Sequence, residues 1–248
     1  MPETTWIIRD SATQLASEFC QLLADRVDAT PRPFTLALTG GHSAGGFYRA
    51  LAQRILRADP VLTASTLAYF WSDERLVPLD HSDSNYLLAR QTLLDPVDVP
   101  DALRHPTPTS LPPDACAAAY LQDVRNHLVQ DAAVIPCFPL IILGLGADGH
   151  TASLFPHTRL YADNDALIRT ADATADHPHP RLTFTPALIN AAAEVWFLIT
   201  GAAKADAVAR LHARSGPPAA TPALVVDPDQ TRITYFCDAP AAANLPTR

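Results

Sequence analysis

A glycine-framed loop in the middle of the chain carries an aspartate and a histidine two positions apart. Asp148 and His150 follow the apolar run Leu140-Ile141-Ile142-Leu143. Imidazole titrates near neutral pH, and a nearby carboxylate makes it a suitable general base. An isolated histidine more often has a structural role, but the position of His150 in a glycine loop after a core strand favours catalysis.

The same loop satisfies the dinucleotide-binding pattern G-x-G-x-x-G with Gly144, Gly146 and Gly149. That pattern needs a long helix after the loop, and Pro156 would interrupt such a helix within two turns. An aspartate also occupies the position closest to where a pyrophosphate would lie. The sequence therefore argues against a dinucleotide, and we expect no cofactor.

A second group of ionisable residues, Asp73-Glu74-Arg75, directly follows an aromatic run that ends at Trp71. Asp73 can orient a base or a substrate hydroxyl, and Arg75 can stabilise a developing oxyanion. Runs of this kind are usually solvated loops. The dense polar stretch 80–86 that follows, with Ser84 at a predicted helix start, favours a site instead.

Paired glycines, Gly40-Gly41, follow the first predicted strand and precede His42 and Ser43 at a predicted helix start. Glycine lets the backbone approach a ligand closely, and a helix N-terminus offers N–H groups and a positive dipole to a phosphate. A turn that needs glycine for its geometry alone would look the same. Taken alone, this segment leaves both interpretations open.

Two later basic residues can supply cations to a phosphate. Arg181 lies before a possible helix start, and Lys204, the single lysine of the chain, follows a predicted strand that ends at Thr200. An ordinary surface position is the commoner case for either residue.

The segment His177-Pro178-His179 suggests metal ligands, but proline holds the two histidines extended and no cysteine lies nearby. Further ligands would have to come from elsewhere in the chain. We interpret the segment as a solvated loop and expect no metal in the reaction.

Continuously apolar strands alternate with helical patterns along the chain, which is typical of a parallel sheet covered on both faces. We expect one α/β domain over residues 1–248, with a doubly wound, mostly parallel, Rossmann-like sheet and helices on both faces. Ligands bind such sheets at the carboxyl ends of the strands. Strands are predicted at 34–38, 67–71, 140–143, 166–170, 195–199 and 232–236, and helices at 11–27, 47–56, 84–94, 115–129 and 202–212.

The net charge of −8 over 248 residues argues against nucleic acid or an anionic membrane as a partner. No run approaches the ~18 apolar residues of a membrane helix, and the N-terminal segment has neither feature of a signal peptide. Four scattered cysteines favour a reducing cytoplasm. We expect a cytoplasmic monomer or small homo-oligomer that binds a small anion, whose phosphate needs only a few local cations.

Together and in this order, these segments resemble the glucosamine-6-phosphate isomerase/6-phosphogluconolactonase family over nearly the whole chain. The run from Asp148 to Pro156, Asp-Gly-His-Thr-Ala-Ser-Leu-Phe-Pro, is the most specific part. The resemblance implies hydrolysis of 6-phosphoglucono-1,5-lactone to 6-phosphogluconate in the oxidative pentose phosphate pathway. The other matching segments are Gly40-Gly41, Asp73-Glu74-Arg75, Ser84-Asn85-Tyr86, Arg181 with Thr183, and Thr200-Gly201 with Lys204.

Two alternatives share this fold by resemblance. A glucosamine-6-phosphate deaminase carries a glutamate where Phe155 stands here and a tyrosine in place of Arg75, so the missing acid and the added cation favour ester hydrolysis. A non-catalytic sugar-phosphate sensor would need a DNA-binding module and a basic surface. One departure from the lactonase pattern is His42-Ser43-Ala44, where the family usually has Ser-Thr-Pro.

These considerations predict a metal-free lactonase in which His150 activates water and Arg75 stabilises the oxyanion. Either Asp148 or Asp73 would orient the imidazole or a substrate hydroxyl. The predicted substrate-binding residues are Gly40, Gly41, His42, Ser43, Arg181 and Lys204.

Overall fold

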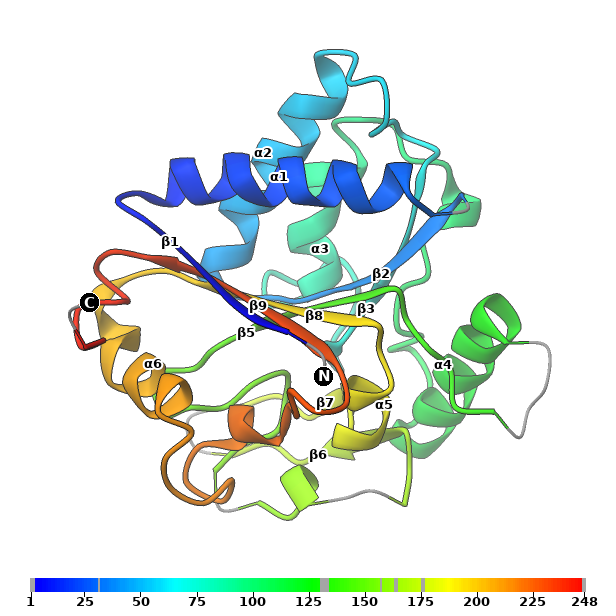
Figure 1. Cartoon of the computed structure of the whole chain (residues 1–248). Helices are drawn as coiled ribbons and strands as arrows, with labels where there is room; N and C mark the ends of the chain where they lie inside the picture. The colour runs from blue at the N-terminus through cyan, green and yellow to red at the C-terminus, as the bar shows by residue number, and fades with distance from the viewer. Residues whose placement is uncertain are drawn as a thin grey trace.

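The computed structural model describes residues 3–30, 32–129, 134–156, 158–162, 165–174 and 177–246, apart from the side chain of His42. Strands and helices alternate over most of this length (Figure 1). The strands are β1 Thr4–Arg9, β2 Phe34–Leu38, β3 Leu67–Trp71, β4 Asp73–Arg75, β5 Leu140–Gly144, β6 Ile168–Ala171, β7 Arg181–Phe184, β8 Glu194–Ile199 and β9 Arg232–Asp238. The α-helices are α1 Ala12–Asp28, α2 His42–Leu56, α3 Asn85–Ala89, α4 Pro113–Leu128, α5 Pro186–Asn190 and α6 Ala205–His212.

Six strands form one parallel sheet in the order β1-β9-β8-β5-β2-β3. All side chains of the strands β2 and β3 are buried, as are those of β8. Burial on both sides explains why these strands read as unbroken apolar runs instead of alternating ones. The predicted doubly wound, mostly parallel α/β sheet is confirmed.

Helices cover both faces of this sheet (Figure 1). One face carries α1, α2 and α3, where Phe19 of α1 meets Trp196 and Phe236 of the sheet edge-on at 5.6 and 5.8 Å between ring centroids. The other face carries α4, α5, α6 and a smaller sheet, packed against residues such as Ile141 and Phe197. Two apolar cores, one on each side, therefore fix the sheet.

The smaller sheet is antiparallel, in the order β4-β7-β6. The strand β4 begins only one residue after β3 ends, so the chain passes from one sheet to the other at Ser72. Pairing of β4 with β7 places Asp73 opposite Thr183 and Arg75 opposite Arg181. The sequence predicted a turn at 73–75 and no strand at 181–184, and both predictions were wrong. The formation of short polar strands depends on the partner strand more than on their own composition.

Serine caps begin two of the helices where the sequence predicted them. The Ser11 hydroxyl accepts a hydrogen bond from the N–H of Gln14 at 3.3 Å, and Ser84 accepts one from Leu87 at 3.2 Å. After α3 the chain continues as a π-helical turn to Leu94. The helix predicted at 202–212 starts with a 3₁₀ turn, and its α-helical part begins at Ala205.

The strand β1 was not predicted. It lies at the edge of the parallel sheet and pairs only with β9, and most of its side chains are partly or fully exposed. Such a strand lacks the continuous apolar signal of its neighbours. None of the helices within the described ranges is long and apolar enough to cross a membrane.

The two leucines Leu51 and Leu56 on α2 test whether the core on the α1/α2 face determines stability. Leu51 is 0% exposed and Leu56 is 64% exposed. We expect Leu51→Ala to lower the free energy of unfolding by ~2–5 kcal/mol, because it leaves a cavity. The matched change Leu56→Ala should stay within ~0.5 kcal/mol in urea titrations. Equal losses in both variants would contradict this account.

Candidate active site

A pocket of about 410 Å³ opens at the carboxyl ends of β2, β3, β5 and β8. Residues that follow each of these strands line it, including Gly40 after β2, Asp73 after β3, Leu145 after β5 and Thr200 after β8. This is the edge at which a parallel α/β sheet binds its ligand. Nearly all the predicted site residues meet here: Gly40, Gly41, Ser43, Asp73, Arg75, His150, Arg181 and Lys204 line the pocket.

The Asp148–His150 pair is formed as the spacing predicted. Asp148 Oδ1 lies 2.7 Å from His150 Nδ1 and also accepts the main-chain N–H of His150 at 3.1 Å. Burial acts to raise the pKa of Asp148, but the hydrogen bonds and charge of His150 outweigh it and lower the pKa to about 2. An ionised carboxylate only accepts hydrogen bonds, so Nδ1 carries the proton and Nε2 is left as the basic nitrogen.

Glycine is needed at two positions of this loop. A Cβ on Gly146 would lie 2.1 Å from His150 Nδ1 and 2.3 Å from Asp148 Oδ1, so any side chain there would separate the pair. Gly149 has φ of +92°, in the left-handed region that favours glycine. The glycines that resemble a dinucleotide pattern therefore make room for the carboxylate and the imidazole.

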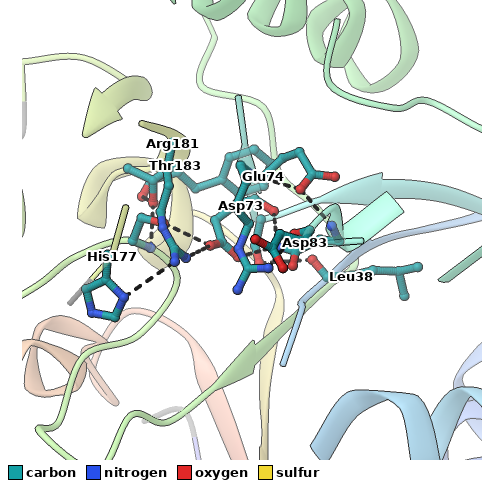
Figure 2. Close-up of polar contacts among 12 residues, drawn as sticks. Leu38, Asp73, Glu74, Asp83, His177, Arg181 and Thr183 are labelled. Carbon is teal, nitrogen blue, oxygen red and sulfur yellow. Dashed lines mark hydrogen bonds and ion pairs between the residues drawn. The ribbon is translucent and has the colours of Figure 1, made fainter. Parts of the chain in front are cut away.

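Asp73 is buried and faces Arg181 rather than the histidine. Its Oδ2 accepts a hydrogen bond from Ser153 Oγ at 2.9 Å and lies 3.7 Å from Arg181 Nη1. Figure 2 shows the guanidinium of Arg181 between Asp73 and His177. Burial lowers the pKa of Arg181 and the charge of Asp73 opposes that shift. The sequence left open which aspartate lies beside the imidazole. In the structure Asp148 contacts His150, and Asp73 contacts Arg181.

Arg75 is held at the pocket by the chain that follows it. Its Nη1 donates a hydrogen bond to the carbonyl oxygen of Asp83. The neighbouring residue Glu74 points away into the protein, where its carboxylate accepts the main-chain N–H groups of Asn85 and Tyr86, each at 2.7 Å. Glu74 thereby anchors the start of α3, which supplies Asn85 to the pocket wall.

The glycine pair lies against Asn85 and the N-terminus of α2. A Cβ on Gly40 would come within 1.9 Å of Asn85 Oδ1, so only glycine fits there. Gly41 has φ of +88° and caps α2 without a side-chain hydrogen bond. Ser43 Oγ lies 2.7 Å from Thr200 Oγ1, which ties this loop to the end of β8. The side chain of His42 lies outside the described part of the structure.

The pocket is positively charged although the chain is negative overall. Arg75, Arg181 and Lys204 line it, and Asp73 is the one carboxylate among the described residues of its lining. Burial lowers the pKa of Lys204, and the negative charge of Asp148 acts against that change. A small dianion would find three cations within one cavity.

Sequence reasoning missed several residues of the wall. The interpretation of His177 as part of a solvated loop was wrong: its ring lines the pocket and stacks on Phe155 at 4.1 Å between centroids. Its ring also lies 5.5 Å from that of His150. From the sequence, Asn85 and Thr200 were named only as parts of motifs. Asn85 directly follows the helix cap Ser84, and Thr200 directly follows a buried strand. Those positions were the available signal that the two residues belong to the site.

Two groups of side chains in the described structure have the composition of a metal site. One is Asp148, His150 and His177, of which the two histidines line the pocket, and the other is His81, Asp83 and His179. In each group the potential ligand atoms lie within 4.8 Å of one another. The first group has an alternative use, because Asp148 and His150 already form a carboxylate–imidazole pair suited to base catalysis.

A parallel sheet with a cationic pocket at its carboxyl ends, lined by an imidazole that a carboxylate orients, defines an α/β protein with a site suited to a small anion. The chain belongs to the family of glucosamine-6-phosphate isomerases and 6-phosphogluconolactonase, which matches residues 9–235.

Individual proteins of known name are similar over most of the chain. A 6-phosphogluconolactonase of Synechocystis sp. is 41% identical over 212 residues, covering 85% of this chain and 84% of the relative. The structure of 6-phosphogluconolactonase from Trypanosoma brucei superposes with a TM-score of 0.84 at 28% identity, covering 99% and 100% of the two chains. A monomeric glucosamine-6-phosphate deaminase shares the fold, with a TM-score of 0.82 at 18% identity over 97% and 99%.

The buried carboxyl of Glu74 predicts a pH dependence of stability. Burial raises its pKa to about 7, against the hydrogen bonds from Asn85, Tyr86 and Arg75 that lower it. The unfolded carboxyl titrates near ~4.3, so between these values the folded state holds a proton that the unfolded state has lost. The free energy of unfolding should therefore fall as pH rises through this window, by at most ~1.4 kcal/mol per pH unit.

Urea titrations from pH 4.5 to 8 would measure this slope. Glu74→Gln removes the titrating carboxyl, so the free energy of unfolding of the variant should fall less steeply with pH than that of the wild type. Glu18→Gln, at an exposed ion pair with Arg9, serves as the control and should keep the wild-type slope. An unchanged slope in Glu74→Gln would show that the carboxyl does not titrate in this range.

Proposed function

We propose that this protein hydrolyses 6-phospho-D-glucono-1,5-lactone to 6-phospho-D-gluconate, as a carboxylic-ester hydrolase of the oxidative pentose phosphate pathway. The observation that carries the proposal is that His150, paired with Asp148, lines the same cavity as Arg75, Arg181 and Lys204. The relatives named 6-phosphogluconolactonase support the choice of substrate. We further infer that residues 1–248 act as one domain, in the cytoplasm; four free cysteines fit a reducing compartment.

The substrate phosphate docks on the loop at Gly40-Gly41 and the N-terminus of α2. Main-chain N–H groups and the helix dipole favour a dianion there, and the absence of a side-chain cap on α2 leaves those groups available. Arg181 and Lys204 close the site from the other strands. His42 and Ser43 stand in the first turn of α2, and their main-chain N–H groups face the bound phosphate.

His150 acts as the general base. Asp148 holds the proton on Nδ1, so Nε2 takes a proton from a water molecule as that water attacks C1 of the lactone. The attack forms a tetrahedral oxyanion, which Arg75 stabilises. The protonated imidazole then gives its proton to the ring oxygen as the C1–O bond breaks. Asp73 contributes by holding Arg181 in place.

No step in this sequence uses a metal ion. Assistance by a general base is typically worth ~10²–10⁴-fold and one oxyanion donor ~3 kcal/mol. Those contributions are sufficient because the six-membered lactone is activated and hydrolyses spontaneously in water, although slowly, so the enzyme needs only a moderate acceleration.

The two alternatives are distinguished by residues of this chain. The deaminase relative shows that the fold accommodates amine chemistry, but the resemblance places a glutamate at the position of Phe155 in deaminases. Here Phe155 is buried and packs against the rings of His150 and His177. A non-catalytic sensor would not need an imidazole positioned by a carboxylate at 2.7 Å.

Removal of the base is the principal test. In chelator-treated protein, His150→Ala should lower kcat by ~10²–10⁴-fold, because water loses its proton acceptor. Rapid mixing with freshly made 6-phosphoglucono-1,5-lactone, followed by proton release, measures the rate above the spontaneous reaction. Asp148→Asn should lower kcat by a smaller factor, because the base remains but its proton is no longer fixed on Nδ1.

The same assay distinguishes the alternatives. Ammonia release from glucosamine 6-phosphate without acceleration of lactone hydrolysis would assign the protein to the deaminases. Binding of 6-phosphogluconate without either reaction would assign it a sensing role. A His150→Ala variant with wild-type kcat would leave the lactonase assignment intact but remove His150 from the mechanism.

Lys204 tests the placement of the phosphate. Lys204→Met should raise KM ~10-fold or more while changing kcat little, because a charge-assisted hydrogen bond to a non-reacting group is lost equally from ground state and transition state. Arg57→Met, just beyond the far end of α2, removes an exposed charge away from the pocket and is the control. A large fall in kcat at unchanged KM would place Lys204 at the reacting carbonyl instead.

A further inference from the structure

A second cluster of histidine and carboxylate groups lies beside the pocket, and the proposed reaction does not use it. His179 Nε2 lies 2.8 Å from Asp83 Oδ2, and the rings of His81 and His179 are 5.4 Å apart in an edge-on arrangement. One ligand atom from each of the three side chains falls within 4.8 Å of the others. We propose that His81, Asp83 and His179 form a binding site for a divalent transition-metal ion such as Zn²⁺.

The fold brings these residues together from segments almost a hundred positions apart. The strands β4 and β7 are antiparallel neighbours, so the chain that leaves β4 runs beside the chain that enters β7. A main-chain hydrogen bond of 2.8 Å from Leu76 to Pro180 fixes this proximity. The sequence argued against a metal at His177-Pro178-His179 because no further ligands were evident, and the turn at 81–83 supplies two.

The two histidines of that segment diverge. His177 turns into the pocket beside Phe155, whereas His179 turns to Asp83. An extended chain alone would place side chains two positions apart on the same side. The divergence therefore comes from the contact that each ring makes, with Phe155 for His177 and with Asp83 for His179. His179 is therefore available to a metal without any displacement of the residues that line the pocket.

The turn that carries His81 and Asp83 is already organised. Main-chain hydrogen bonds of 2.9 Å join His81 to Pro78 and Ser84 to His81, and the N–H of Asp83 donates to His81 Nδ1 at 3.1 Å. That last bond orients the ring of His81 within the turn. The side chains of Asp83 and His179 are 51% and 27% exposed, so they can rotate the short distance needed for coordination.

Two imidazoles and one carboxylate select the kind of ion. Nitrogen ligands suit zinc, cobalt, nickel and copper, whereas magnesium and calcium prefer oxygen. Zinc takes four ligands in a tetrahedron with nitrogen at ~2.0–2.1 Å, so a water molecule would complete this set. Binding would link the segment before β7 to the turn at 81–83, whose Asp83 carbonyl holds the guanidinium of Arg75.

The test measures metal binding itself and is independent of the lactonase proposal. Equilibrium dialysis of chelator-treated protein against Zn²⁺ gives the number of ions bound, and Co²⁺ gives an absorption spectrum that reports the coordination geometry. His179→Gln and His81→Gln should each lower the affinity for one equivalent of Zn²⁺ by at least ~10–100-fold. Loss of a residue that only hydrogen-bonds to a ligand already has that effect, and these residues would be ligands themselves. Circular dichroism of the metal-free variants should match the wild type.

His177→Gln is the matched control. It removes a histidine only two positions from His179 in the sequence, but one that belongs to the other potential cluster. It should retain the equivalent that His179→Gln loses, and it should retain the tetrahedral Co²⁺ spectrum. The proposal fails if the wild type binds no Zn²⁺, if His179→Gln binds as much as the wild type, or if the loss occurs only in His177→Gln. None of these results depends on whether the protein hydrolyses a lactone.

Discussion

The passage of the chain from one sheet to the other at Ser72 is the constraint on which the site depends. Ser72 is completely buried, and its N–H donates to the carbonyl of Leu38 while its own carbonyl accepts from Phe184, both at 2.8 Å. Its hydroxyl is 3.0 Å from the carbonyl oxygen of Leu38 and 3.3 Å from that of Ile142. One small residue therefore joins β2, β3, β5 and β7, and a larger side chain would find no space there.

The ionisable groups that follow Ser72 are buried with hydrogen-bonding partners, which is the condition for placing polar groups inside a protein. Asp73 has Ser153 and Arg181, and Glu74 has the start of α3. The contact with Ser153 links the antiparallel sheet to the loop after β5, the contact with Arg181 joins β4 to β7, and the contacts of Glu74 hold α3 against β4. The pocket is thus assembled from both sheets, and two of its cations are held in place: Arg181 by Asp73 and Arg75 by the main-chain carbonyl of Asp83.

Local patterns predicted the parallel sheet well, because continuous apolar runs such as 34–38 and 67–71 have few other uses. The Asp148–His150 pair was also predictable, since a spacing of two within a glycine loop brings both side chains to one place. The strands β4 and β7 were not, because Asp73-Glu74-Arg75 gains strand structure only from its partner. His177 was missed for a similar reason: its stacking on Phe155 depends on a contact across the fold.

The pairing of β1 with β9 has a consequence for biosynthesis. Thr4 lies opposite Ile233 and Arg9 opposite Asp238, so β1 leaves the ribosome long before its partner β9. Until then β1 has no neighbour in the sheet, and one edge of β8 is also unpaired. Contacts between such distant segments form slowly, and exposed strand edges favour aggregation. The parallel sheet of the nascent chain must therefore remain incomplete until β9 has been synthesised.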